Sequence, residues 1–223
     1  MRTGADFDAY YMSPDPWGLK RASRRDRALG AIVGPYASGR SVLELGCGEG
    51  HLTATVFSEA RSVRGIDISA TAVSRATALA LPNATFEVSD FLAVSLAGYD
   101  VIAAIECLYY LSAAEQETFL RTLVREHDGV FILSAPIIGA NEHRTYYTHS
   151  GIEQMLASYG LSIIEWRNLN AYWKAGMGGA LAAAMTRLPF AEAAVRYLPE
   201  AWVYQRCYVA RRANDSRAEK RPA

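Results

Sequence analysis

A glycine-rich segment followed by an isolated acid is the part of this sequence that points most clearly to chemistry. The string ELGCGEG, residues 44–50, places Gly46, Gly48 and Gly50 between a predicted strand and a predicted helix. Glycine adopts positive φ without strain and lets a ligand approach the backbone closely. Asp67 ends the next predicted strand, where a carboxylate can accept hydrogen bonds from two ribose hydroxyls. Together the loop and the acid predict a nucleoside-binding site.

The residue at the start of this loop indicates which kind of nucleoside the site would bind. A dinucleotide loop reads Gly-x-Gly-x-x-Gly and holds a pyrophosphate at a helix N-terminus. Here Glu44 precedes the first glycine, which favours a positively charged or amine-bearing ligand. Cys47 is interpreted as a small filler within the loop. His51, directly after the loop, is a further candidate for the ligand's charged end.

These residues need a scaffold, and the pattern around them predicts one. Short apolar runs at 41–46, 62–69, 84–90, 99–106 and 129–136 alternate with helical segments at 50–59, 70–80 and 112–126. Such alternation is typical of a parallel sheet with helices on both faces. A helix over 148–159 and strands over 161–169 and 203–211 follow. The period-two pattern of the last one predicts a final edge strand.

Composition limits the remaining choices. The chain has 223 residues, of which 51% are hydrophobic, and its 23 basic residues balance its 23 acidic ones. A hydrophobic content of this size supports a packed domain, and the balanced charge disfavours nucleic-acid binding. Three widely spaced cysteines indicate neither a zinc site nor a disulfide framework. We expect a cytoplasmic protein with no membrane span, no metal, and a monomeric or homodimeric state.

The glycine loop and Asp67 resemble motifs I and II of class I S-adenosylmethionine (SAM) methyltransferases, over roughly residues 36–210. The resemblance implies a Rossmann-like α/β fold with a seven-stranded sheet, mostly parallel with its last strand antiparallel. It implies that the loop backbone faces the methionine moiety of SAM and that Asp67 binds the ribose. Ile68 is then expected against the adenine, with Asp90 and Phe91 at its amino group. For Asp90 a helix N-cap is the alternative role.

The N-terminal string YYMSPDPWGL, residues 10–19, adds a second resemblance. Together with the glycine loop it is similar to NodS-like N-methyltransferases, which methylate a free amine of a chitooligosaccharide. Apolar residues at helical spacing predict a helix over 22–36. The resemblance implies a cap over residues 1–36 in which Tyr11 and Trp17 enclose the sulfonium. A purely structural anchor is the alternative. Residues 24–26 read Arg-Arg-Asp where that family suggests Tyr-Glu, so the acceptor can differ.

The main domain is expected over residues 37–213, with an acceptor-side insertion at 168–201 and a disordered tail at 214–223. Glu106 ends the fourth strand and is the predicted catalytic carboxylate, next to the cofactor. His143 and His149 are the other catalytic candidates, because a loop at this end of a sheet often carries function. Acceptor contacts are expected from a group of aromatic side chains: Tyr109, Tyr110, Tyr146, Tyr147, Tyr172 and Trp173.

Three functions remain open at this point. N-methylation of an amino sugar or related small amine needs a carboxylate that orients the nitrogen and takes its proton. O-methylation of a phenolic or quinone-like metabolite would instead use a histidine base. The third alternative is a catalytically silent SAM-binding module.

Overall fold

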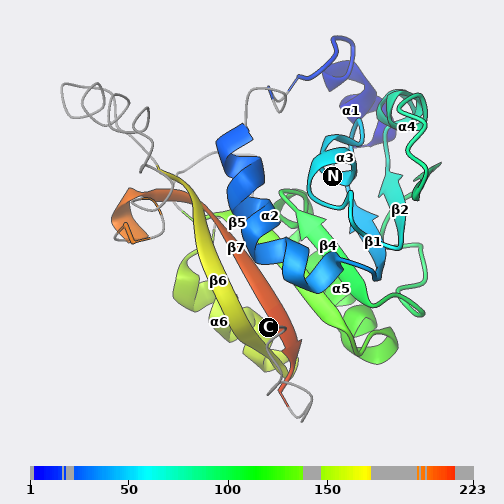
Figure 1. The fold of residues 1–223 in the computed structure, drawn as a ribbon. Helices are drawn as coiled ribbons and strands as arrows, with labels where there is room; N and C mark the ends of the chain where they lie inside the picture. Colours follow the sequence, from blue (N-terminus) through cyan, green and yellow to red (C-terminus); the bar gives the residue numbers. More distant parts are fainter. Residues whose placement is uncertain are drawn as a thin grey trace, which may run out of the picture.

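A computed structural model describes residues 3–16, 18, 23–137, 147–171, 195, 197–198 and 200–213. Figure 1 shows helices packed around a single twisted sheet. The elements follow one another as α1 (Gly4–Tyr10), α2 (Ser23–Ala37), β1 (Ser41–Leu45), α3 (His51–Thr55), β2 (Ser62–Asp67), α4 (Ala70–Thr77), β3 (Ala84–Val88), β4 (Val101–Ile105), the 3-10 helix η2 (Leu108–Tyr110), α5 (Ala113–Glu126), β5 (Val130–Pro136), α6 (His149–Ser158), β6 (Leu161–Ala171), the 3-10 helix η3 (Glu200–Trp202) and β7 (Val203–Arg212).

The strands form one seven-stranded sheet in the order β3-β2-β1-β4-β5-β7-β6. Strands β1 to β5 pair in parallel, and β7 pairs antiparallel with both β5 and β6. The predicted Rossmann-like α/β sheet, mostly parallel with its last strand antiparallel, is confirmed. The strand order reverses between β1 and β4, and ligands of open α/β sheets bind at the carboxyl ends of the strands around such a switch point.

The predicted edge position of the last strand is wrong. Strand β7 lies between β5 and β6, so that β6 forms the edge. Gln205 and Arg206, two adjacent polar residues of this strand, are only 8% and 3% exposed. They are buried because the sheet is covered on both faces, with Cys207 in one hydrophobic cluster and Tyr208 in the other.

Two hydrophobic clusters, one on each face of the sheet, make up the core. On one face, Leu29, Ile32 and Val33 of α2 pack against alternate residues of β1, β4 and β5. On the other face, α5 and α6 cover the intervening residues of the same strands. Figure 1 shows α2 in front of the sheet and α5 and α6 behind it. The three layers leave the carboxyl ends of the parallel strands free to build a site.

Side-chain caps fix where several of the helices begin. Ser112 and Glu115 form a capping box at the start of α5, and Ser69 caps α4. These caps satisfy backbone N–H groups that have no partner within the helix. Helix α1 was not predicted from the sequence. Its signal was present, because Thr3 and Asp6 also form a capping box.

Several sequence-based expectations fall outside the described residues: those for Trp17, His143, Tyr146, Tyr172 and Trp173, most of the 168–201 insertion, and the 214–223 tail. Within the described part of the chain, no helix is both long enough and apolar enough to cross a bilayer.

Candidate active site

A cavity of about 370 Å³ opens at the carboxyl ends of β1, β2 and β4. This volume lies within the range of about 300–1,000 Å³ typical of small-molecule sites. Eleven of the residues singled out in the sequence line it together: Tyr11, Gly46, Cys47, Gly48, Asp67, Ile68, Asp90, Phe91, Glu106, Tyr109 and Tyr110. The structure thus brings most of the predicted cofactor residues and two predicted acceptor residues into one space.

The glycine loop after β1 has no room for a side chain at two of its positions, Gly46 and Gly48. Gly46 and Gly48 have φ values of +68° and +54°, in the left-handed region that favours glycine. A Cβ atom on Gly46 would lie 2.8 Å from Cys107 Cβ, and one on Gly48 would lie 2.8 Å from the Tyr11 hydroxyl oxygen. Burial raises the pKa of the Cys47 thiol well above its usual value, which favours the protonated thiol.

Asp67 is held at the floor of the cavity by backbone hydrogen bonds. Its two carboxylate oxygens accept from the N–H groups of Gly48 at 2.8 Å and Ser69 at 2.9 Å. Burial nevertheless raises its pKa, because desolvation outweighs these bonds. One oxygen is therefore fixed toward the glycine loop, which orients the carboxylate and leaves lone pairs for a ligand hydroxyl.

Helix α1 packs over the turn that connects β2 to α4. A Cβ on Gly4 would lie 2.8 Å from the Ile68 carbonyl oxygen. Asp8 accepts hydrogen bonds from the Ser69 hydroxyl at 2.5 Å and the Thr71 N–H at 3.0 Å. Tyr11, just after the helix, reaches Gly48 of the glycine loop. The N-terminal segment therefore covers the side of the cavity that contains Asp67.

Two predicted cofactor residues, Glu44 and Gly50, do not line the cavity. Glu44 is 1% exposed and accepts a hydrogen bond from the Thr53 hydroxyl on α3. Burial raises its pKa to about 8. Gly50 has a φ of +76° and is the N-cap of α3. Both residues therefore support the conformation of the loop, and neither faces the cavity.

Glu106 faces the cavity from a strained turn directly after β4. Its φ is +58°, one of three such non-glycine values in the described chain. One carboxylate oxygen accepts from the Ser134 hydroxyl at 2.7 Å. The other accepts from Gln205 Nε2 at 2.8 Å and the Tyr109 hydroxyl at 3.4 Å. Burial raises the pKa of Glu106, while these donors and the charge of Arg25 oppose the rise.

Aromatic rings continue the wall beyond Glu106. The Tyr109 and Tyr110 rings lie 4.7 Å apart between centroids, and Tyr110 meets Phe7 of α1 edge to face at 5.3 Å. Phe91 packs on Phe119 of α5 at 5.9 Å.

Asp90 accepts from the Leu92 N–H at 2.9 Å within a turn, and no helix follows it. The alternative role of a helix N-cap is thereby excluded for Asp90.

Sequence reasoning missed several polar residues of the cavity, and Gln205 and Arg25 are the two whose contacts bear on the site. Gln205 comes from β7 and Arg25 from the first turn of α2, and both line the cavity. Arg25 donates through Nε and Nη2 to one oxygen of Asp26, at 3.3 and 3.0 Å. The other oxygen of Asp26 lies 2.6 Å from His51 Nε2. His51 therefore pairs with α2 instead of lining the cavity itself.

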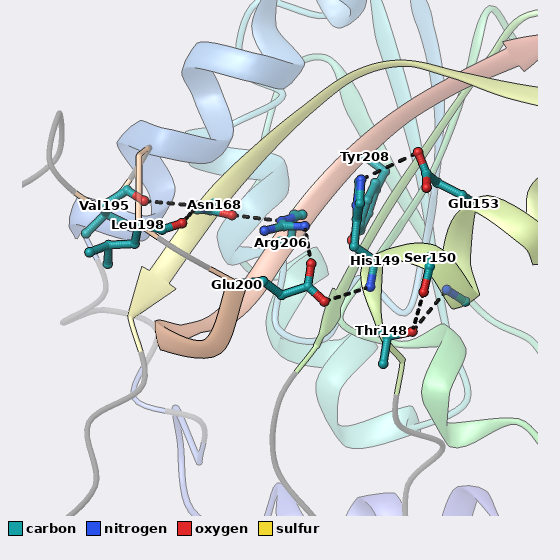
Figure 2. Close-up of polar contacts among 11 residues, drawn as sticks. Thr148, His149, Ser150, Glu153, Asn168, Val195, Leu198, Glu200, Arg206 and Tyr208 are labelled. Atoms are coloured by element: carbon teal, nitrogen blue, oxygen red, sulfur yellow. Dashed lines mark hydrogen bonds and ion pairs between the residues drawn. The ribbon is translucent and has the colours of Figure 1, made fainter.

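His149, predicted as a catalytic base, lies in a different cluster. Figure 2 shows its ring beside Tyr208, in a polar network that also contains Glu200 and Arg206. The His149 and Tyr208 rings stack at 5.6 Å, and Trp166 lies 5.3 Å from His149. None of this network lines the cavity. His149 was predicted as a catalytic base because it follows β5 closely in sequence. That closeness does not determine whether its side chain faces the cavity.

Tyr147, predicted to contact the acceptor, is a core residue. It is 7% exposed, and its hydroxyl donates to Gln116 of α5 at 2.8 Å. It does not line the cavity. Its aromatic character suggested stacking on a ligand, but the ring fills space between α5 and the start of α6.

Comparison with known proteins agrees with this fold. Residues 42–126, which include the glycine loop, Asp67, Asp90 and Glu106, match the family model described as a methyltransferase domain. No curated protein sequence matches the chain.

Solved structures of low sequence identity share the fold across nearly the whole chain. The N-methyltransferase NodS from Bradyrhizobium japonicum WM9, with S-adenosylhomocysteine (SAH), is 17% identical, with coverage of 95% of this chain and 99% of its own and a TM-score of 0.67. The 1,6-didemethyltoxoflavin-N1-methyltransferase from Burkholderia thailandensis is 18% identical, with coverage of 95% and 87% and a TM-score of 0.66. The magnesium protoporphyrin IX methyltransferase from Synechocystis PCC 6803, with bound SAM, is 18% identical, with coverage of 95% and 98% and a TM-score of 0.63.

Residues 42–126 thus form a methyltransferase domain, and the chain has the class I, Rossmann-like fold of SAM-dependent methyltransferases. The cavity fits that cofactor. Asp67 is a partly buried acid that can accept hydrogen bonds from ribose hydroxyls, and the loop beside it has no room for a side chain at Gly46 or Gly48. Acids at several points of the lining suit a ligand that carries a sulfonium and an ammonium group.

Proposed function

We propose that this methyltransferase transfers a methyl group to a nitrogen atom of a small molecule, an amino sugar or a related amine. The observation that carries the proposal is Glu106, a desolvated carboxylate that faces the cavity at the end of β4. An amine acceptor needs a group that orients its nitrogen and takes its proton. Burial raises the pKa of Glu106 above its ordinary value, which makes the carboxylate a stronger base.

The surroundings of Glu106 keep its carboxylate oriented. Gln205 can only donate to it, because the Gln205 Oε1 atom already accepts from Asn170 Nδ2. Ser134 holds the opposite carboxylate oxygen. Good alignment of reacting groups is worth about 7–11 kcal/mol of the barrier, so fixing this side chain is a substantial part of catalysis.

The remaining lining residues have distinct proposed roles. Methyl transfer is an in-line displacement for which SAM supplies the electrophilic carbon. Asp67 would hold the ribose hydroxyls, Ile68 and Phe91 would pack on the adenine, and Asp90 would meet its amino group. The proton from the acceptor nitrogen passes to Glu106. Tyr109 and Tyr110 offer ring faces for a sugar or flat acceptor.

We further propose that the N-terminal segment is a cap. The contacts of Gly4, Phe7, Asp8 and Tyr11 with the glycine loop, with the turn after β2 and with Tyr110 support this role. A segment in that place excludes water from the reacting atoms, which strengthens electrostatic interactions inside the site.

O-methylation of a phenolic or quinone-like acceptor is the second candidate. The paired tyrosine rings are compatible with a flat acceptor. The histidine base that it needs is not supplied by His149, which packs on Tyr208 outside the cavity.

The test is methyl transfer from labelled SAM to a panel of matched compounds: free amino sugars and aromatic amines, their N-acetyl derivatives, and phenols. We expect label on free amines and none on the N-acetyl partners, because acylation removes the nucleophilic lone pair. Label on phenols with the amines untouched would replace N-methylation by the second candidate. No transfer to any class would leave a SAM-binding protein without the proposed activity.

A further inference from the structure

Two amide side chains form a chain of hydrogen bonds that ends at Glu106. Gln205 of β7 lines the cavity and donates from Nε2 to one oxygen of Glu106 at 2.8 Å. The Oε1 atom of Gln205 accepts from Nδ2 of Asn170, on the edge strand β6. Asn170 itself does not line the cavity. We infer that Asn170 is a positioning residue for the proposed base, because it fixes the direction of the Gln205 amide and so keeps a donor facing the carboxylate.

The direction of the two amides matches an ionised Glu106. A carboxylate accepts hydrogen bonds and cannot donate them, so the end of Gln205 that meets it is the amide NH2 group. Turned around, Gln205 would present its oxygen to Glu106, which repels a carboxylate and suits a protonated carboxyl. Asn170 opposes this turn, because the NH2 group that it directs at Gln205 can only donate. The link to catalysis rests on the proposed function, in which Glu106 takes the proton of the acceptor.

The backbone of β6 aims Asn170 at this contact. Asn170 pairs with Gln205 across the two strands, and the register of β6 on β7 is irregular on both sides of Asn170. Irregularities of this kind re-aim side chains and are common next to active sites. Gln205 is only 8% exposed, so little water is available to replace a lost partner of its amide. A change at Asn170 is therefore transmitted to the Gln205 amide rather than absorbed by solvent.

Several other groups also act on Glu106. Besides Gln205, the hydrogen-bonding and titratable groups that face it among the described residues are Ser134, Tyr109, Arg25, Cys107 and Cys207. Burial raises the pKa of Glu106, and its hydrogen-bond donors and the charge of Arg25 oppose the rise. Turning the Gln205 amide would remove one donor and bring an oxygen to the carboxylate. The pKa of Glu106 would then rise further, and less of the base would be ionised at neutral pH.

The experiment follows the ionisation of Glu106 directly and needs no acceptor. In protein labelled with ¹³C at the glutamate carboxyl carbons, the Glu106 signal is the one missing from Glu106→Gln, and its NMR shift is followed against pH. Asn170→Asp replaces the donor by an acceptor of the same shape, so that Gln205 turns its NH2 group away from Glu106. We expect the midpoint of Glu106 to rise by about one to two pH units, the equivalent of one hydrogen bond to a charged group.

The negative charge that Asn170→Asp adds would also raise this midpoint, and a matched background separates the two causes. Gln205→Met has a side chain of similar length and no amide to turn. In a double-mutant cycle, Asn170→Asp should therefore shift the midpoint much less in the Gln205→Met background than in the wild type. Binding of SAH by each variant is the folding check. If Asn170→Asp fails it, Asn170→Leu removes the donor without adding charge and should still raise the midpoint.

Each other outcome has a definite meaning. A shift of equal size in both backgrounds would be an effect of charge alone and would overturn the inference, as would an unmoved midpoint in the folded Asn170 variant. Methyl transfer to an amine over the same pH range then tests the proposed function separately. The acid limb of the rate profile should move to higher pH with the midpoint. A raised midpoint with an unmoved rate profile would keep the positioning role of Asn170 and remove Glu106 as the base.

Discussion

Replacing Glu106 by Gln tests the proposed base with little structural disturbance. In the wild type, one oxygen of Glu106 accepts from Gln205 Nε2 and the other from the Ser134 hydroxyl. A Gln side chain can place its carbonyl oxygen toward Gln205 and its amino group toward Ser134, whose oxygen can accept. The variant therefore keeps its hydrogen-bond partners and loses the negative charge and the ability to take a proton.

The expected size of the effect follows from the contribution of a general base to the rate. General-base catalysis contributes roughly 10²–10⁴-fold, equivalent to about 2.7–5.5 kcal/mol of barrier. We expect methyl transfer to an amine acceptor to fall by that factor. SAH affinity should change by less than about tenfold, or 1.4 kcal/mol. The two measurements separate a catalytic role of Glu106 from a role in holding the cofactor.

Stability provides an independent check with a definite sign. Burial raises the pKa of Glu106 in the folded protein above the ordinary value of 4.5. The fold therefore favours the neutral carboxyl, and stability from this group is lost as pH rises from 4.5 through the folded-state pKa. At pH 8 the Glu106→Gln variant should melt no lower than the wild type. A near-normal transfer rate in a folded, SAH-binding variant would refute the assignment of Glu106 as the base.

Three further predictions follow from the geometry. Gly48→Ala should weaken SAH binding and lower the melting temperature, because its Cβ would lie 2.8 Å from the Tyr11 hydroxyl; Tyr11→Phe in the same chain should restore part of both, and no rescue would contradict the contact. Glu44→Gln should flatten the pH dependence of unfolding between about pH 5 and 8, since burial raises the folded-state pKa of Glu44 to about 8 and its stability is lost as pH rises through that window; an unchanged urea-unfolding profile would count against this. His149→Ala should leave methyl transfer near the wild-type rate, and a collapse would bring back the histidine-base alternative.

The repeating elements were predictable because their patterns are local. Val101–Ile105 is apolar throughout, and Val130–Pro136 is apolar apart from Ser134. Both strands are fully buried, and both were found from the sequence. The place of β7 was not, since burial of Gln205 and Arg206 depends on α2, α6 and β6 folding around them. A pattern of polar and apolar residues cannot distinguish a polar side chain in water from one with buried partners.

The same limit applies to the site. The glycine loop and Asp67 are close in sequence and share a known spacing, so their meeting was predictable. Gln205 and Glu106 are 99 positions apart, and only the sheet topology brings β7 beside the end of β4. Arg25 was noted as a departure from the family pattern, but its position in the cavity depends on how α2 packs on the sheet.

The left-handed backbone at Glu106 restricts how this site can be redesigned or diverge. Its φ of +58° costs about 1–2 kcal/mol for a residue with a side chain, and more for a β-branched one. Glycine, asparagine and aspartate are the residues that best tolerate this conformation. A change of acceptor chemistry by substitution at this position is therefore confined to a short set of side chains, unless the turn after β4 is rebuilt with it.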